Sequence, residues 1–109
     1  MNMPTRTAFY LLACLAFPLS AQAQTPPADP VAGRDIAVKW CASCHDVTPE
    51  QKTAQAGIPS FMKIANLKGV TLDSLIAIQT MPHRPMLDLD LSRKVKRDIA
   101  AYILSLREK

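Results

Sequence analysis

The sequence predicts a small all-α domain, and three observations support this. Apolar residues near the C-terminus recur at helical spacing and form a single stripe: Val95, Ile99, Tyr102, Ile103 and Leu106. No segment alternates apolar and polar residues in the way that a half-buried strand does. The chain has 109 residues, with no internal repeat and no sign of a second folded domain.

The first 23 residues read as a secretory signal peptide. Arg6 supplies the early positive charge, residues 8–19 form an apolar run, and Ala21-Gln22-Ala23 has the small-x-small form of a cleavage site. The apolar run is shorter than the roughly 20 residues that span a bilayer, and an uncleaved N-terminal anchor is the alternative. Cys14 lies inside this run, ahead of the cleavage site, so we interpret it as an inert leader residue.

We therefore expect export to the periplasm and cleavage after Ala23. Residues 24–109 then form a mature chain of 86 residues, and losing Arg6 lowers the formal charge from +4 to +3. A chain this short buries a modest core and gains from a covalent or metal staple. Its mildly basic charge suits partner proteins with acidic faces. No aromatic-studded basic array points to nucleic acid, and we expect no stable membrane insertion after cleavage.

The mature chain divides into a flexible lead-in over residues 24–30, which holds three prolines, and a folded domain over residues 31–107. The first helix is predicted over residues 31–43. Asp29 suits its N-cap, and Pro30 suits its first turn, where a missing N–H costs nothing. Three apolar residues fall on one side of this helix: Ile36, Ala37 and Trp40.

The remaining elements are short. We expect a loop over residues 46–58, a short helix over 60–65 and another over 72–79, with Thr71 as its cap. Residues 81–86 contain two prolines and predict an extended or turning segment. The last helix is predicted over residues 92–106; four basic residues near its start, Arg93, Lys94, Lys96 and Arg97, favour a solvated face over a docking patch.

Cys41-Ala42-Ser43-Cys44-His45 has the Cys-x-x-Cys-His spacing that is typical of a c-type haem attachment site. Two thiols at this spacing can form thioethers with the two vinyl groups of one haem, and the next residue can offer its imidazole to the iron. A thioredoxin-type redox pair is one alternative, but the chain shows no βαβ pattern. Half of a zinc site is another, but no cysteine follows Cys44.

These motifs, in this order, resemble the small mono-haem class I cytochromes c of bacteria. The resemblance covers Val31 to Leu106 and is carried by three segments: Gly33 through His45, Pro59-Ser60-Phe61, and His83-Arg84-Pro85-Met86 followed by Leu91-Ser92 and residues 98–103. It implies three to five helices wrapped around one covalently bound haem c per chain, with the first and last helices crossing.

The resemblance also implies roles for single residues. Gly33 would allow close approach to Ile99 and Tyr102 on the last helix, because glycine has no side chain. The family often has an aromatic residue at the position of Ala37, and we expect Trp40 to compensate for its loss. The carbonyl of Pro59 would accept the second ring N–H of His45; an ordinary loop proline is the alternative.

The second axial ligand would come from residues 81–86. The resemblance favours Met86, which lies six residues before Ser92, as the family spacing requires. Met81 is the runner-up: it has the Met-Pro pairing often seen at a ligand methionine, but it lies eleven residues before Ser92. His83 is a weaker candidate, and Met62 is interpreted as a core residue of a short helix.

A thioether ligand favours ferrous iron and fills the site, which predicts a one-electron carrier and not an enzyme. Redox partners of dehydrogenase, cytochrome bc1 or terminal-oxidase type are implied by the resemblance. A haem subunit of a dehydrogenase complex is a close variant. Two other classes stay open: an enzyme or sensor with an open haem site, and a disulfide oxidoreductase using Cys41 and Cys44.

Overall fold

The computed structural model describes residues 24–81, 83 and 86–109, so the predicted leader lies outside the described residues. The described residues form four helices and no strand. The helices are α1 (Pro30–Trp40), α2 (Phe61–Ala65), α3 (Leu72–Thr80) and α4 (Arg93–Ser105). The prediction of an all-α fold is confirmed.

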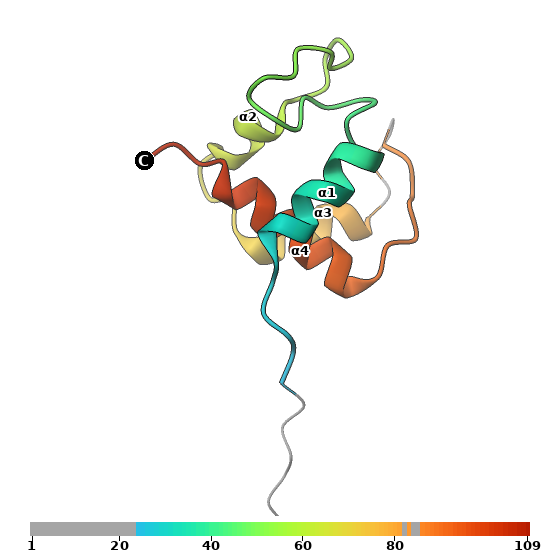
Figure 1. The fold of residues 1–109 in the computed structure, drawn as a ribbon, viewed down its shortest axis with the longest axis vertical. Coiled ribbons are helices and arrows are strands. Elements are labelled where there is room, and N and C mark those ends of the chain that lie inside the picture. Colours follow the sequence, from blue (N-terminus) through green and yellow to red (C-terminus); the bar gives the residue numbers. More distant parts are fainter. Residues whose placement is uncertain (1–23, 82, 84–85) are drawn as a thin grey trace, which may run out of the picture.

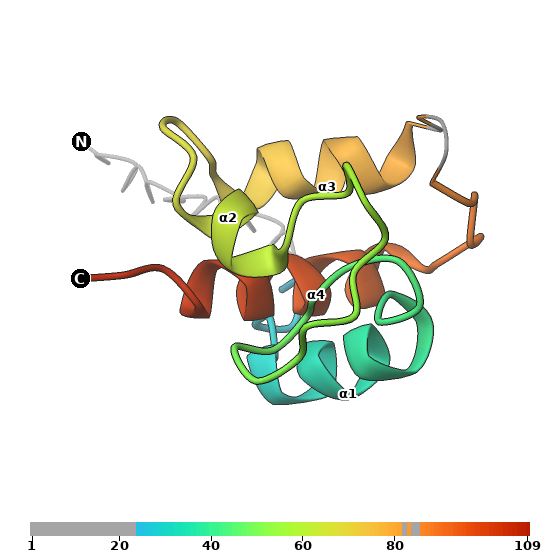
Figure 2. The ribbon, with the colours of Figure 1, turned by 90° about the horizontal axis from the view of Figure 1, so that it is seen from above.

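Helix α4 is the centre of the fold, and the other three helices pack on it (Figure 1). Seen from above, α1 and α3 lie on opposite sides of α4, and α2 lies near its C-terminal end (Figure 2). The stripe of apolar residues on α4 explains this arrangement, because Ile99, Tyr102 and Ile103 are all buried. The loop that carries residues 46–60 arches from the end of α1 to the start of α2.

Side-chain caps begin each helix. Asp29 Oδ1 accepts hydrogen bonds from the N–H groups of Val31 and Ala32, and Thr71 forms a capping box with Ser74. Ser60 and Ser92 cap α2 and α4 in the same way. The caps predicted at Asp29 and Thr71 are therefore confirmed.

The first helix ends earlier than predicted. We expected it to run to Ser43, whereas α1 ends at Trp40 and residues 41–45 form a series of turns. The reason is a change in hydrogen bonding: the N–H groups of Cys44 and His45 both bond to the carbonyl of Cys41, at 3.1 and 2.9 Å. The chain tightens there and leaves the helical path.

The crossing of α1 and α4 depends on Gly33. A Cβ at this position would overlap the carbonyl oxygen of Asp98 and lie 2.8 Å from the Ile99 nitrogen. The close approach predicted for Gly33 is confirmed, but the nearest atoms are the main chain of Asp98 and Ile99, and not Tyr102. Only a residue without a side chain fits between the two backbones.

Trp40 does not compensate for the small side chain of Ala37. Ala37 is fully buried, whereas Trp40 remains 51% exposed and its ring lies 5.4 Å from the Lys39 ammonium group. The buried side of α1 consists of Gly33 and Ala37, one turn apart, so the expectation that Trp40 fills the crossing is wrong. Small residues at both positions let α1 approach α4 closely, and the indole has no place in the crossing.

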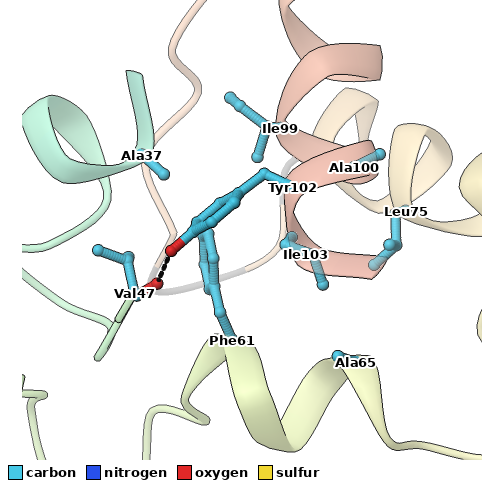
Figure 3. Close-up of a cluster of buried hydrophobic side chains, with 9 residues drawn as sticks. All are labelled: Ala37, Val47, Phe61, Ala65, Leu75, Ile99, Ala100, Tyr102 and Ile103. Atoms are coloured by element: carbon cyan, nitrogen blue, oxygen red, sulfur yellow. Dashed lines mark hydrogen bonds between the residues drawn. The ribbon is translucent and has the colours of Figure 1, made fainter. Parts of the chain in front are cut away.

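Nine side chains form the buried core, and Figure 3 shows Tyr102 and Phe61 at its middle. They come from all four helices and from the loop after the cysteine motif: Ala37, Val47, Phe61, Ala65, Leu75, Ile99, Ala100, Tyr102 and Ile103. The Tyr102 hydroxyl donates a 2.6 Å hydrogen bond to the Val47 carbonyl, which ties that loop to α4 (Figure 3). Met62, predicted as core, is half-buried and packs against this cluster.

Asp98 is a charged residue in the core, with 2% of its surface exposed. Its Oδ1 accepts the N–H of Asp29 at 2.9 Å, and its Oδ2 pairs with Lys94 Nζ at 2.7 Å. Burial raises the pKa of Asp98, but the hydrogen bonds from Lys94 and Asp29, with the charges of Lys94 and Arg97, outweigh burial and hold the pKa below its ordinary value. The carboxylate thus links the start of α1 to α4.

Candidate haem site

The cysteine motif lies directly after α1, on a compact turn. Besides the two bonds to the Cys41 carbonyl, the N–H of Ala42 bonds to the Ala37 carbonyl at 3.1 Å, so the turn continues from the helix end. Both thiols are free and half-buried. Burial and the neighbouring Cys44 raise the pKa of the Cys41 thiol to about 11, so Cys41 is a protonated thiol in this arrangement.

The imidazole of His45 is oriented by Pro59. Its Nδ1 lies 2.6 Å from the Pro59 carbonyl oxygen, which can only accept a hydrogen bond, so Nδ1 carries the proton and donates. This tautomer leaves the lone pair on Nε2 for a metal. The ring also contacts Phe61, with centroids 5.4 Å apart and planes tilted by 54°. The structure thus brings His45 and Pro59 into contact, the arrangement that the family resemblance implied.

The loop after the motif folds back on it through polar side chains that the sequence analysis missed. Asp46 Oδ1 accepts the N–H groups of Thr53 and Ala54, at 2.7 and 2.9 Å, and the Asp46 carbonyl accepts the N–H of Phe61. Gln51 bonds to the motif itself. These residues follow no helical or strand periodicity. The sequence signal that could have identified them is their position shortly after His45.

The candidates for a second ligand gather at the end of α3. Met81, His83 and Met86 line one small cavity, of about 10 Å³, together with Ile78, Gln79, Leu87 and Asp88. His83 Nδ1 lies 3.3 Å from the Met81 carbonyl oxygen, so this imidazole already has a local partner. Met81 is 63% exposed and Met86 is half-buried.

Comparison with known proteins decides the family. No protein-family model matches the chain, and no solved structure gives a significant match. A curated protein named Cytochrome c-552, from Bradyrhizobium diazoefficiens, is 39% identical over 95 residues, which cover 86% of this chain and 91% of that protein. The chain belongs to the cytochrome c family.

As a cytochrome c, this chain is an electron-transfer protein and not an enzyme, which confirms both the resemblance and the functional class predicted from it. Membership implies a covalently bound haem c and redox partner proteins. No helix in the described residues has the length and apolar character needed to cross a membrane.

The donor set of this cytochrome c fits that cofactor. Cys41 and Cys44 are free thiols on one turn, and the next residue presents an imidazole whose Nδ1 is held by Pro59 and whose Nε2 has no hydrogen-bond partner among the described residues. The apolar ring of Phe61 lies beside the imidazole of His45. These residues have the donor atoms needed to attach a haem and to ligate its iron.

Proposed function

We propose that this cytochrome c is a periplasmic one-electron carrier. Cys41 and Cys44 would hold its single haem c as thioethers, and His45 and Met86 would be the axial ligands. When bound, haem c supplies an Fe(III)/Fe(II) couple. The observation that carries the proposal is the 2.6 Å contact between His45 Nδ1 and the Pro59 carbonyl, which prepares Nε2 as a ligand.

The protein's own residues would determine which oxidation state of the iron is favoured. The Pro59 carbonyl fixes the ring of His45 and increases the basicity of its free nitrogen. A methionine sulfur on the other side would favour the ferrous state and occupy the position that a substrate would need. Both ligands then stay in place during electron transfer, which is the behaviour of a carrier.

Met86 is supported over Met81 by its position in the chain. The N–H of Met81 bonds to the Ala77 carbonyl at 3.0 Å, so Met81 is anchored as the C-cap of α3 and its side chain is largely exposed. Met86 lies beyond this helix and before the cap of α4 at Ser92, in a half-buried position. Its place in the connection between α3 and α4, beyond the cap at Met81, supports Met86 as the ligand.

An optical spectrum of the exported protein tests the axial ligands. We expect a sharp ferrous α-band and a weak far-red ferric band, which is typical of methionine sulfur on ferric haem. Met86→Ala should abolish the far-red band, and Met81→Ala should retain it. Loss of the band in Met81→Ala alone would assign the ligand to Met81. A haem spectrum without the band that responds to carbon monoxide would favour an open site.

Export and processing belong to the same proposal, with residues 1–23 as leader, 24–30 as lead-in and 31–107 as the haem domain. The intact mass of the periplasmic protein should equal residues 24–109 plus one haem. Retention of residues 1–23 would favour an uncleaved anchor. Co-purification of a stoichiometric larger oxidoreductase would favour the alternative of a dehydrogenase haem subunit over a free shuttle.

A further inference from the structure

One amide side chain joins the two ends of the cysteine motif. Gln51 Nε2 lies 2.8 Å from the Ala42 carbonyl oxygen and 2.9 Å from that of His45, so its two hydrogens can serve both carbonyls. Gln51 Oε1 accepts the N–H of Val47 at 3.0 Å. Thr53 Oγ1 is a further neighbour of Nε2, at 3.0 Å. Gln51 therefore bonds to main-chain atoms before, at and after His45.

These main-chain groups need a partner because α1 has already ended. Within the described part of the chain, the carbonyls of Ala42 and His45 accept hydrogen bonds from Gln51 and from no other group. Carbonyls at a helix end that lack such a partner must be satisfied by water or left unpaired, which weakens the turn. Gln51 supplies the hydrogen-bond donors that a continuing helix would have given to these two carbonyls.

The bonds of Gln51 also place His45 relative to the rest of the fold. The N–H of Val47 donates a hydrogen bond to Gln51, and the carbonyl of Val47 accepts one from the hydroxyl of Tyr102 on α4. The ring of His45 is held separately, at Nδ1, by Pro59. The main chain and the side chain of His45 are thus fixed from two independent directions.

We propose that Gln51 is a positioning residue for His45: it holds the attachment turn in place, and so would keep Nε2 available to the haem iron. This rests on the proposed function, in which His45 is an axial ligand. The role needs an amide, since the same side chain must donate to two carbonyls and accept from one N–H. A carboxylate at this position could still accept from Val47 but would face two carbonyl oxygens without a hydrogen.

The test uses the exported, haem-loaded protein and NMR of its ferric form. The variants are Gln51→Leu and Gln51→Glu. Lys52→Ala is the matched control, because Lys52 lies in the same loop and its ammonium group, among the described residues, bonds to the Pro49 carbonyl and not to the motif. Lys52→Ala also controls for charge, because loss of the ammonium group one residue away lowers the net charge by the same one unit as Gln51→Glu.

We expect Gln51→Leu to shift the paramagnetically displaced signals of the His45 ring and to speed exchange of the Val47 N–H about tenfold, as loss of one hydrogen bond predicts. Gln51→Glu should show displaced signals near neutral pH and recover only in part on acidification, because a protonated carboxyl has one hydrogen and can donate to only one of the two carbonyls. Lys52→Ala should keep the wild-type ring signals.

Unchanged His45 ring signals in both Gln51 variants would overturn the proposal, as would the same displacement in Lys52→Ala, which would assign the effect to charge alone. If Gln51→Leu fails to fold, the comparison of Gln51→Glu at two pH values in one folded protein still decides. Absence of any iron-shifted histidine signal in the wild type would instead refute the proposed function, before a variant is compared.

Discussion

Gly33 and Asp98 lie backbone to backbone where α1 crosses α4, and a Cβ on residue 33 would overlap the Asp98 carbonyl oxygen. Main-chain atoms in two helices cannot yield as a flexible side chain can. We expect Gly33→Ala to lower the free energy of unfolding by about 3 kcal/mol, the upper part of the range for overpacking a well-packed contact. Urea unfolding of the haem-loaded protein measures this.

The matched control for Gly33→Ala is Val38→Ala, on the exposed side of the same helix, where a change within about 0.5 kcal/mol is expected. Equal effects of the two substitutions would show that the crossing tolerates a methyl group. In that case the helices can separate at little cost, and the role assigned to Gly33 is wrong.

Asp98→Asn tests the buried carboxylate. At neutral pH we expect a loss of about 2 kcal/mol, because the amide side chain would retain an acceptor for the Asp29 N–H but lose the charge-assisted bond to Lys94. The pKa of Asp98 is lower in the folded protein than the ordinary 3.8, so its contribution is fully present above the unfolded pKa and is lost as pH falls through the folded value.

The difference in stability between wild type and Asp98→Asn should therefore be constant from neutral pH to about pH 5, and should shrink below about pH 4. Chemical unfolding at a series of pH values measures it. A difference that does not change on acidification would mean that Asp98 carries no net charge-dependent stability, and that its burial is compensated only by neutral hydrogen bonding.

The sequence predicted the helices well because the signals for them are local. Asp29 and Thr71 cap the helices that they were expected to cap, and the stripe on α4 identified three of the nine core residues, Ile99, Tyr102 and Ile103. Asp98 and Gln51 could not be predicted in this way. Asp98 bonds to a main-chain group 69 residues away, and Gln51 bonds to a turn that only forms because α1 ends early. The contact of His45 with Pro59 was predicted from the family resemblance, because no pattern of apolar residues indicates it.

Tyr102→Phe removes the hydroxyl that bonds to the Val47 carbonyl and leaves a buried acceptor without its partner. We expect a loss of about 1.5 kcal/mol in the free energy of unfolding, with little change in packing. Burial raises the pKa of Tyr102 above 10.0, so its absorbance should titrate later than that of an exposed tyrosine. Stability equal to wild type would show that water replaces the hydroxyl.

Arg107 fastens the C-terminus to the connection between α2 and α3. Its Nε donates to the Ala65 carbonyl and one terminal nitrogen donates to the Val70 carbonyl, both at 2.9 Å. Arg107→Ala should cost about 1 kcal/mol, and Arg107→Lys should recover only part of this, because an ammonium group cannot reach both carbonyls in a fixed fork. Thermal unfolding of both variants measures the difference, and full recovery by lysine would contradict the two-carbonyl contact.

Removal of the proposed haem attachment should affect the whole fold. The described core holds nine side chains, whereas Ile78, Met81 and Leu87, near the end of α3, stay largely exposed in the protein chain alone. A core this small in a chain of this length needs a staple, which covalent haem would supply. We expect Cys41→Ser with Cys44→Ser to lose bound haem and cooperative unfolding, while Ser43→Ala, in the same turn, keeps both. Circular dichroism during thermal unfolding measures this, and a sharp transition in the haem-free double variant would show that the four helices are stable without the cofactor.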